Sequence, residues 1–126
     1  MNDRRVASEL IEAIAAQDWG RLQACFAPEV QFRALIPPGV RERFGAAATA
    51  ELIGAWFGDA DPLELVDSQI DAVGDRVHVS YRFHAIEEGK SYLVEQHLYC
   101  VVGSDGIESV NLLCSGFRPA AVTAAT

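Results

Sequence analysis

The sequence predicts an α+β domain in which N-terminal helices pack on one side of an antiparallel sheet. Apolar residues recur at helical spacing in three stretches of the first 57 residues. After Pro62, apolar and polar residues alternate, and turn dipeptides that contain glycine separate the alternating runs. Helices followed by a run of strands are typical of the α+β class.

Composition places the chain among single-domain proteins. Its 126 residues are 50% hydrophobic, enough for one core without a metal or disulfide. Eighteen acidic against ten basic residues give a formal charge of -8, which disfavours nucleic-acid binding. No apolar run reaches the ~18–20 residues of a membrane span, and residues 1–10 lack a signal-peptide core. Three cysteines, an odd number, are read as reduced thiols, so we expect a cytoplasmic protein.

Two helices are predicted at the start of the chain. Asp3 can cap the first, whose apolar positions follow at helical spacing: Val6, Leu10, Ile11 and Ile14. Asp18 begins a second helix, which Pro28 ends. The apolar positions of this helix also share one face: Trp19, Leu22 and Phe26.

A short strand and a third helix are predicted next. Residues 30–36 read as the strand, and Pro37-Pro38-Gly39 breaks it. Residues 46–57 read as the helix, and residues 58–62 as a linker to the sheet. One face of the helix is apolar: Leu52, Ile53, Trp56 and Phe57.

Three hairpin turns set the register of the four strands that follow. Gly74-Asp75 and Glu88-Gly89 each fit a two-residue loop, and a five-residue loop centred on Asp105 fits the third turn. Directly opposed residues must share a face of the sheet, and all three registers agree on one mostly apolar face. Its residues are Val66, Ser68, Ile70, Ala72, Val77, Val79, Tyr81, Phe83, Val94, Gln96, Leu98, Cys100, Val110, Leu112 and Cys114.

The order of these elements resembles the nuclear transport factor 2-like superfamily, in its SnoaL-like branch. The resemblance spans about residues 5–117, and short motifs carry it: Asp18-Trp19 with Leu22, Phe26-Ala27-Pro28-Glu29-Val30 with Phe32, Phe44-Gly45, and Asp105-Gly106-Ile107. Two further stretches look like a subgroup of small bacterial members without an assigned reaction: Glu95-Gln96-His97 and Cys114-Ser115-Gly116-Phe117-Arg118-Pro119. The resemblance implies a cystatin-like cone, whose curved sheet wraps the helices around an apolar cavity. We expect one domain at residues 1–119 and a flexible tail at 120–126.

If the apolar face lines that cavity, the registers place four residues with polar atoms in one row across it. Ser68 faces Tyr81, which in turn faces Gln96. Gln96 also faces Cys114. Apolar walls with a few convergent polar groups are what a small-molecule site needs. We therefore predict a ligand site in which Tyr81 and Gln96 provide hydrogen bonds and the remaining wall residues are Phe32, Trp56, Phe83, Leu98 and Leu112. The alternative is that this row only packs the core.

The superfamily includes steroid isomerases, epoxide hydrolases, dehydratases and polyketide cyclases, as well as proteins that only bind. The resemblance places the three catalytic positions of the steroid isomerases at Leu10, Ala34 and Gln96, none of which transfers a proton at neutral pH. The acid–arginine–acid set of the epoxide hydrolases is missing from the predicted cavity face. We therefore predict binding of a small apolar or aromatic molecule. Two alternatives stay open: an enzyme of the isomerase, cyclase or dehydratase type, with Tyr81 as a candidate acid, and a dimeric interaction module.

A register wrong by one residue would reverse the two faces. It would turn Glu95, His97 and Arg82 into the cavity, where they form a plausible acid–base set. In the predicted register, these residues lie on the outer face instead. We expect a homodimer through that face, which mixes polar groups with four larger side chains: Leu93, His97, Tyr99 and Leu113. No metal site and no cofactor are expected, because the histidines lack near partners and no nucleotide motif is present.

Overall fold

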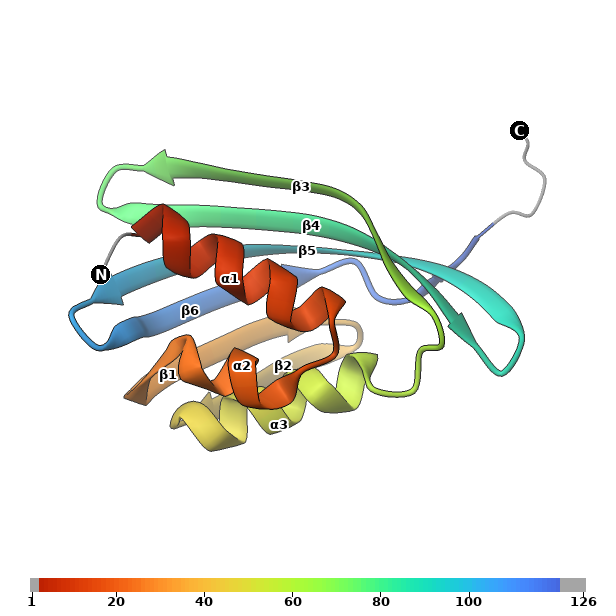
Figure 1. The fold of residues 1–126 in the computed structure, drawn as a ribbon, viewed down its shortest axis with the longest axis horizontal. Coiled ribbons are helices and arrows are strands. Elements are labelled where there is room, and N and C mark those ends of the chain that lie inside the picture. The colour runs from red at the N-terminus through yellow and green to blue at the C-terminus, as the bar shows by residue number, and fades with distance from the viewer. Residues whose placement is uncertain (1–2, 121–126) are drawn as a thin grey trace.

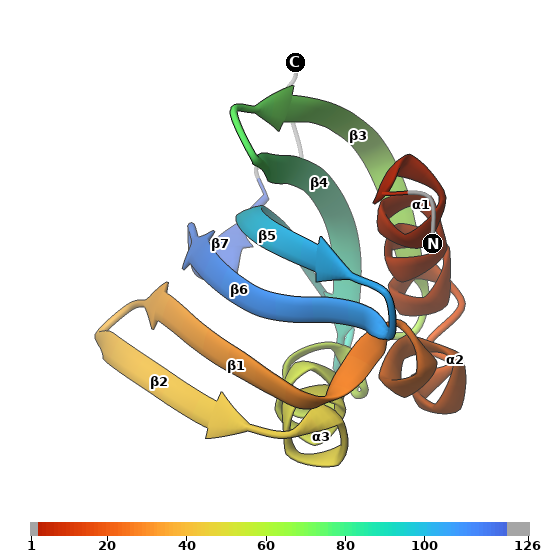
Figure 2. The same ribbon diagram turned by 90° about the vertical axis from the view of Figure 1, so that its left-hand side faces the viewer.

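The structure of the protein is a computed structural model that describes residues 3–120. Within them, three helices pack against a seven-stranded sheet (Figure 1). The sheet curves, and the helices lie on its concave side (Figure 2). The elements follow the order α1 (Asp3–Ala15), α2 (Trp19–Ala24), β1 (Phe26–Ile36), β2 (Gly39–Phe44), α3 (Ala46–Phe57), β3 (Leu63–Val73), β4 (Arg76–Glu87), β5 (Lys90–Gly103), β6 (Gly106–Cys114) and β7 (Arg118–Pro119).

The sheet is mixed, whereas the sequence predicts an antiparallel one. Its strands lie in the order β2-β1-β6-β5-β4-β3, and β7 pairs with β5. β1 runs parallel to β6, and every other pair is antiparallel. Parallel neighbours need a long connection, which α3 and the three strands after it provide here. Alternation within a strand carries no information about a partner so distant in the sequence.

The predicted meander is confirmed, and its first two turns have the predicted two-residue loops. The third loop is shorter than predicted, two residues instead of five, because Gly103 pairs with Gly106 and an irregularity in the pairing of β5 with β6 absorbs the difference. Ser68 pairs with Tyr81, Tyr81 with Gln96, and Gln96 with Cys114. Irregularities shift the register only near strand ends, between Leu65 and Asp67 and between residues 101 and 102. Turn chemistry therefore defines which residues share the concave face.

The second helix is shorter than predicted. It ends at Ala24, so Phe26 and Pro28 belong to β1, which begins four residues before the predicted strand. The pairing of β1 with β6 is irregular between Phe26 and Gln31. Proline fits such a stretch because no ladder hydrogen bond is needed from its nitrogen. The start of α2 agrees with the prediction, because the Asp18 carboxylate accepts a hydrogen bond from the backbone N–H of Arg21 at 3.1 Å.

Strand β2 is absent from the prediction, which treats Pro37-Pro38-Gly39 only as a break. The turn instead leads into a strand that pairs with the second half of β1, from Gln31↔Phe44 to Ile36↔Gly39. Apart from Gly39, all residues of β2 are exposed. Charged residues are common on edge strands because they discourage pairing with other chains. Three charged residues lie between Val40 and Phe44, so this segment lacks the apolar alternation that predicts a strand.

The core lies between α1, α3 and the concave face. α1 buries its predicted apolar positions together with two alanines: Val6, Ala7, Leu10, Ile11, Ala13 and Ile14. α3 has the predicted bounds and packs on β1. At the C-terminal end, the backbone N–H of Ala120 donates to Ser91 O at 3.0 Å, while residues 121–126 of the predicted tail lie outside the described residues. No helix within residues 3–120 is long and apolar enough to cross a membrane.

The turn before β6 makes one glycine position testable. Gly106 has φ +120°, and a Cβ there would meet the Cys25 carbonyl oxygen at 2.8 Å. Gly74 has φ +60°, and a Cβ added there would meet no other atom within 4 Å. We expect Gly74→Ala to cost about 1–2 kcal/mol of unfolding free energy, from backbone strain alone. Gly106→Ala should cost more, because strain and a backbone clash add. Urea denaturation measures both, and equal losses would contradict this account.

Candidate functional site

A buried chain of hydrogen bonds crosses the concave face at the predicted row. The Tyr81 hydroxyl on β4 donates to Gln96 Oε1 on β5 at 2.5 Å. Gln96 Nε2 donates to Cys114 Sγ on β6 at 3.3 Å. Tyr81 is 2% exposed and Gln96 is 0% exposed. Three of the four predicted row residues are therefore joined, on three neighbouring strands.

Ser68 is the fourth predicted row residue, and the structure places it apart from this chain. It pairs with Tyr81 in the predicted register but is exposed. Its strand, β3, is the last strand of the sheet and is solvent-exposed along most of its length. The register alone could not show this, because it fixes the face of a residue and not what covers it.

The predicted wall residues belong to the concave face of the sheet and to α3. Phe32, Phe83, Leu98 and Leu112 are buried. Trp56 on α3 is half-buried, and its ring centre lies 6.2 Å from that of Phe32. The predicted wall residues are therefore buried or half-buried, and their role in a ligand site stays a prediction.

Two further aromatic residues extend this wall. Phe57 of α3 lies 5.5 Å from Phe83 and 5.7 Å from Phe117, measured between ring centres. Phe117 belongs to the segment after β6 and is half-buried. Strand periodicity cannot find Phe117, since it lies beyond the last predicted strand. The aromatic series Tyr81, Phe83, Phe57 and Phe117 thus runs from the polar row to the C-terminal segment.

The chemistry open to the row is hydrogen bonding without proton release. Burial raises the pKa of Tyr81 well above its ordinary value, and the neighbouring Cys114 and Cys100 thiols raise it further. Tyr81 therefore stays protonated at neutral pH and acts as a donor. The Gln96 amide nitrogen carries two N–H groups and, among residues 3–120, bonds only to Cys114. The row can orient a neutral polar group but holds no base.

A carboxyl group that the sequence does not predict lies farther along β4, the strand of Tyr81. Alternation from Ala85 places Glu87 on the concave side, at the end of β4. Burial raises the pKa of Glu87, and the charges of Asp59 and Glu88 add to this effect. On β4, the predicted concave face ends at Phe83 and does not include this carboxyl group.

The acid–base set of the alternative register lies on the convex face. Glu95, His97 and Arg82 are neighbours there, because the pairing of β4 with β5 is the predicted one. Arg82 Nη2 lies 2.7 Å from Glu95 Oε1, and His97 Nε2 lies 2.9 Å from Glu95 Oε2. Hydrogen bonds from His97 and Arg82 lower the pKa of Glu95. Over residues 3–120, no group of three or more histidine, cysteine, aspartate or glutamate side chains is arranged to hold a metal ion.

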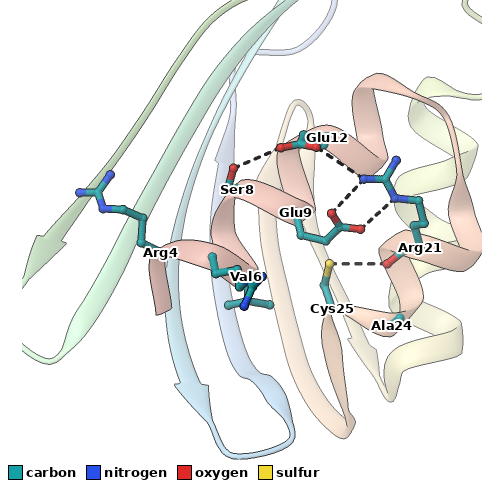
Figure 3. A pocket seen from close by; sticks show the side chains of 9 residues that line it. Arg4, Val6, Ser8, Glu9, Glu12, Arg21, Ala24 and Cys25 are labelled. Atoms are coloured by element: carbon teal, nitrogen blue, oxygen red, sulfur yellow. Dashed lines mark hydrogen bonds and ion pairs between the residues drawn. The ribbon is translucent and has the colours of Figure 1, made fainter. Parts of the chain in front are cut away.

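Two grooves on the surface of residues 3–120 are lined mostly by residues outside the predicted site. One, of about 820 Å³, lies along α1 and α2, where Arg21 joins Glu9 at 2.8 Å and Glu12 at 3.6 Å (Figure 3). Cys25 also lines it, and burial raises the pKa of this thiol to about 11. A second groove, of about 550 Å³, includes the predicted wall residue Phe32 together with parts of β1, β2 and β6. Neither was predicted from the sequence.

The buried pair makes a prediction about stability. Tyr81→Phe leaves Gln96 Oε1 without its donor, and Gln96→Leu leaves the Tyr81 hydroxyl without its acceptor. Each should cost about 1–3 kcal/mol of unfolding free energy. Cys114 Sγ still accepts from the backbone N–H of Gly116 in both variants. The double variant should lose clearly less than the sum of the single losses. A double-mutant cycle in urea measures this, and strictly additive losses would show that the bond contributes nothing.

Comparison with known proteins gives a family and a fold. A sequence profile of the SnoaL-like domain matches residues 7–106. A "putative polyketide cyclase" from Xanthomonas campestris pv. campestris has 23% identity and a TM-score of 0.68, with 89% of this chain and 92% of that chain covered. A hypothetical protein with a ketosteroid isomerase-like fold from Catenulispora acidiphila DSM 44928, in complex with trimethylamine, has 12% identity and a TM-score of 0.71, covering 88% and 85%.

A third structure is an NTF2-like protein of unknown function from Cytophaga hutchinsonii ATCC 33406, with 16% identity, a TM-score of 0.61 and 91% of each chain covered. At such identities, these likenesses show the fold alone. Among curated proteins, none matches the chain. The profile match covers most of the domain, and the curved sheet with its three helices agrees with it. This chain belongs to the SnoaL-like domain family of the nuclear transport factor 2-like superfamily.

Proposed function

We propose that this protein binds a small apolar or aromatic molecule inside the curved sheet, with Tyr81 and Gln96 orienting a carbonyl or hydroxyl group of the ligand. The observation that carries the proposal is the buried Tyr81–Gln96–Cys114 chain in otherwise apolar surroundings. Apolar walls desolvate a ligand, and a few fixed polar groups give it one orientation.

The same groups define which ligands fit. Tyr81 stays protonated, and Gln96 carries no charge, so the row is neutral. A charged ligand would lose its hydration without an opposite charge in return, which is unfavourable by several kcal/mol. A ligand carbonyl can accept from the second N–H of Gln96, and a ligand hydroxyl can donate to Gln96 Oε1. The row therefore favours neutral ketones, phenols and alcohols.

The structural neighbours support a small-molecule site in this fold. One is described as a polyketide cyclase by inference, and another is in complex with the small molecule trimethylamine. A reaction on this chain has weaker support, because the raised pKa of Tyr81 disfavours its use as an acid catalyst. We therefore propose binding and not an isomerase, cyclase or dehydratase.

A matched pair of probes tests the proposal. Naphthalene and 2-naphthol differ by one hydroxyl group, so their affinities isolate the polar contact. Wild-type protein should bind 2-naphthol about threefold to tenfold more tightly, the equivalent of one net hydrogen bond of about 0.5–1.5 kcal/mol. The double variant Tyr81→Phe/Gln96→Leu should bind both probes equally well, because the apolar walls remain. Fluorescence titration measures the four dissociation constants.

Two outcomes would contradict this proposal. Absence of binding by either probe to wild-type protein would remove the apolar site itself. A preference for 2-naphthol that survives in the double variant would place the hydroxyl elsewhere on the protein, away from Tyr81 and Gln96.

We further propose that the convex face pairs with a second copy of the chain. Large side chains stay exposed on the convex faces of β1, β2, β5 and β6: Leu35, Val40, Leu93, Tyr99 and Leu113. A groove of about 530 Å³ runs among most of them. Exposed apolar side chains gathered in one region are typical of protein interfaces. The cytoplasm remains the proposed setting, supported by three cysteines that are all unpaired.

Substitution of one exposed leucine tests this dimer. Leu113 on the convex face is 52% exposed, and Leu65 on β3 is 42% exposed and pairs with the concave-face residue Phe83. Leu113→Glu should shift sedimentation from dimer to monomer, because two carboxylates would be buried against apolar surface. Leu65→Glu is the matched control and should stay dimeric. A wild-type protein that sediments as a monomer would end the proposal.

A further inference from the structure

Five side chains form an unbroken hydrogen-bonded chain across the convex face of β3, β4 and β5, here called the histidine chain. Asp71 Oδ1 lies 2.9 Å from His78 Nδ1, and His78 Nε2 lies 3.0 Å from His97 Nδ1. His97 Nε2 lies 2.9 Å from Glu95 Oε2. Glu95 Oε1 accepts from Arg82 at 2.7 Å. Both nitrogens of each imidazole ring therefore have a partner.

The number of protons in this chain follows from its bonds. The contacts from Asp71 to Glu95 are three hydrogen bonds, and each needs one proton. Two ionised carboxylates and two neutral imidazoles hold only two protons, one on each ring. The carboxylates accept, so the ring protons point towards Asp71 and Glu95. His78 Nε2 and His97 Nδ1 would then face each other with two lone pairs at 3.0 Å.

We propose that His78 and His97 form a proton-binding site, in which one additional proton is shared between Nε2 of His78 and Nδ1 of His97. With this proton bound, all three hydrogen bonds exist at once. The ring planes lie within 9° of each other, and the ring centres are 5.2 Å apart. With 3.0 Å between the nitrogens, the rings meet edge to edge, as an N–H···N bond requires.

Two carboxylates beside the pair favour the added positive charge, Asp71 from β3 and Glu95 from β5. The Arg82 cation on β4 opposes it, but Arg82 bonds to Glu95 and pairs with the acidic Asp67 of β3. Hydrogen bonds from His97 and Arg82 lower the pKa of Glu95, so the extra proton stays on the imidazoles. β6 presents only uncharged side chains here, Asn111 and Leu113, opposite Tyr99 and His97. With one shared proton, the charges of the histidine chain sum to zero.

Tyr99 gives the site a connection to the rest of the convex face. Its ring lies 4.9 Å from that of His78, with 19° between the planes. An imidazolium over the face of a tyrosine ring is favourable. The same Tyr99 lines the convex groove together with Leu35, Val40 and Leu113. Protonation of the pair therefore changes the charge directly beside the proposed dimer surface.

The consequence for assembly rests on the dimer proposed above. A two-fold interface presents the same surface patch from both copies, so the dimer carries two histidine chains, one from each copy. Loss of the shared proton leaves one net negative charge on each histidine chain and removes one hydrogen bond between β4 and β5. Like charges then meet across the interface. Dimerisation should weaken reversibly as the pH rises through the range in which histidine titrates.

Nitrogen NMR on uniformly ¹⁵N-labelled full-length protein tests the proton site directly. A scalar coupling between His78 Nε2 and His97 Nδ1 is expected near pH 6, since such coupling exists only through a shared proton. It should disappear reversibly at higher pH. His84 is the internal control, because its ring has one carboxylate partner, Glu64 at 3.1 Å, and no second histidine. Absence of the coupling from about pH 5 to pH 8 would overturn the proposal.

Variants separate the site from a merely structural contact. His97→Gln should remove the coupling, because His78 then has no second imidazole beside it, while His84→Gln should leave the coupling intact. Loss of the signal in both variants would mean a general change of structure and would count against the proposal. The wild-type spectrum already decides the question if His97→Gln fails to fold.

Sedimentation at pH 6 and pH 8 tests the effect on assembly. The dimer dissociation constant of wild-type protein should rise between these pH values, and that of His97→Gln should change less. A pH-independent dimer in a protein that shows the coupling would refute the effect on assembly. A monomer at both values would refute the proposed dimer, while the NMR result would still decide the proton site.

Discussion

The register of the β-meander is the constraint on which the rest of the structure depends. Side chains alternate strictly along a strand, so one residue of slippage would exchange the two faces. The turn at Gly89 fixes the β4–β5 pairing that places Tyr81 beside Gln96 in the core and His78 beside His97 outside it. Both proposed sites therefore depend on the same hairpin, on opposite faces of the two strands that they share, β4 and β5.

The two faces use polar groups in different ways. Inside, the Tyr81–Gln96–Cys114 chain is neutral and buried, so it can stay in apolar surroundings without a counter-charge. Outside, the histidine chain combines charges of both signs and remains near solvent, where partial screening makes a change of one charge tolerable. The sheet thus separates a group suited to orienting a ligand from a group suited to gaining or losing a proton.

What the sequence could predict depended on how local the determining interaction is. Alternation and turn residues placed Tyr81 opposite Gln96, because both signals act within one hairpin. The same reasoning could not detect β2, a largely charged strand at the edge of the sheet. It also could not detect the parallel pairing of β1 with β6, which joins segments far apart in the sequence. Burial was predicted for Ser68 from its face alone, but the position of β3 at the sheet edge leaves it exposed. Phe117 lies outside any strand pattern, so only its position in space connects it to the site.

The position of β6 has a consequence for how the chain reaches this structure. β6 lies between β1 and β5, so it alone joins the N-terminal hairpin of β1 and β2 to the later strands. Its contacts with β1 pair residues such as Phe26 and Ile107, which are among the most distant in the sequence. Closing such long loops is slow compared with forming local hairpins. During synthesis, the ribosome must therefore release almost the whole domain before the two halves of its sheet can become one.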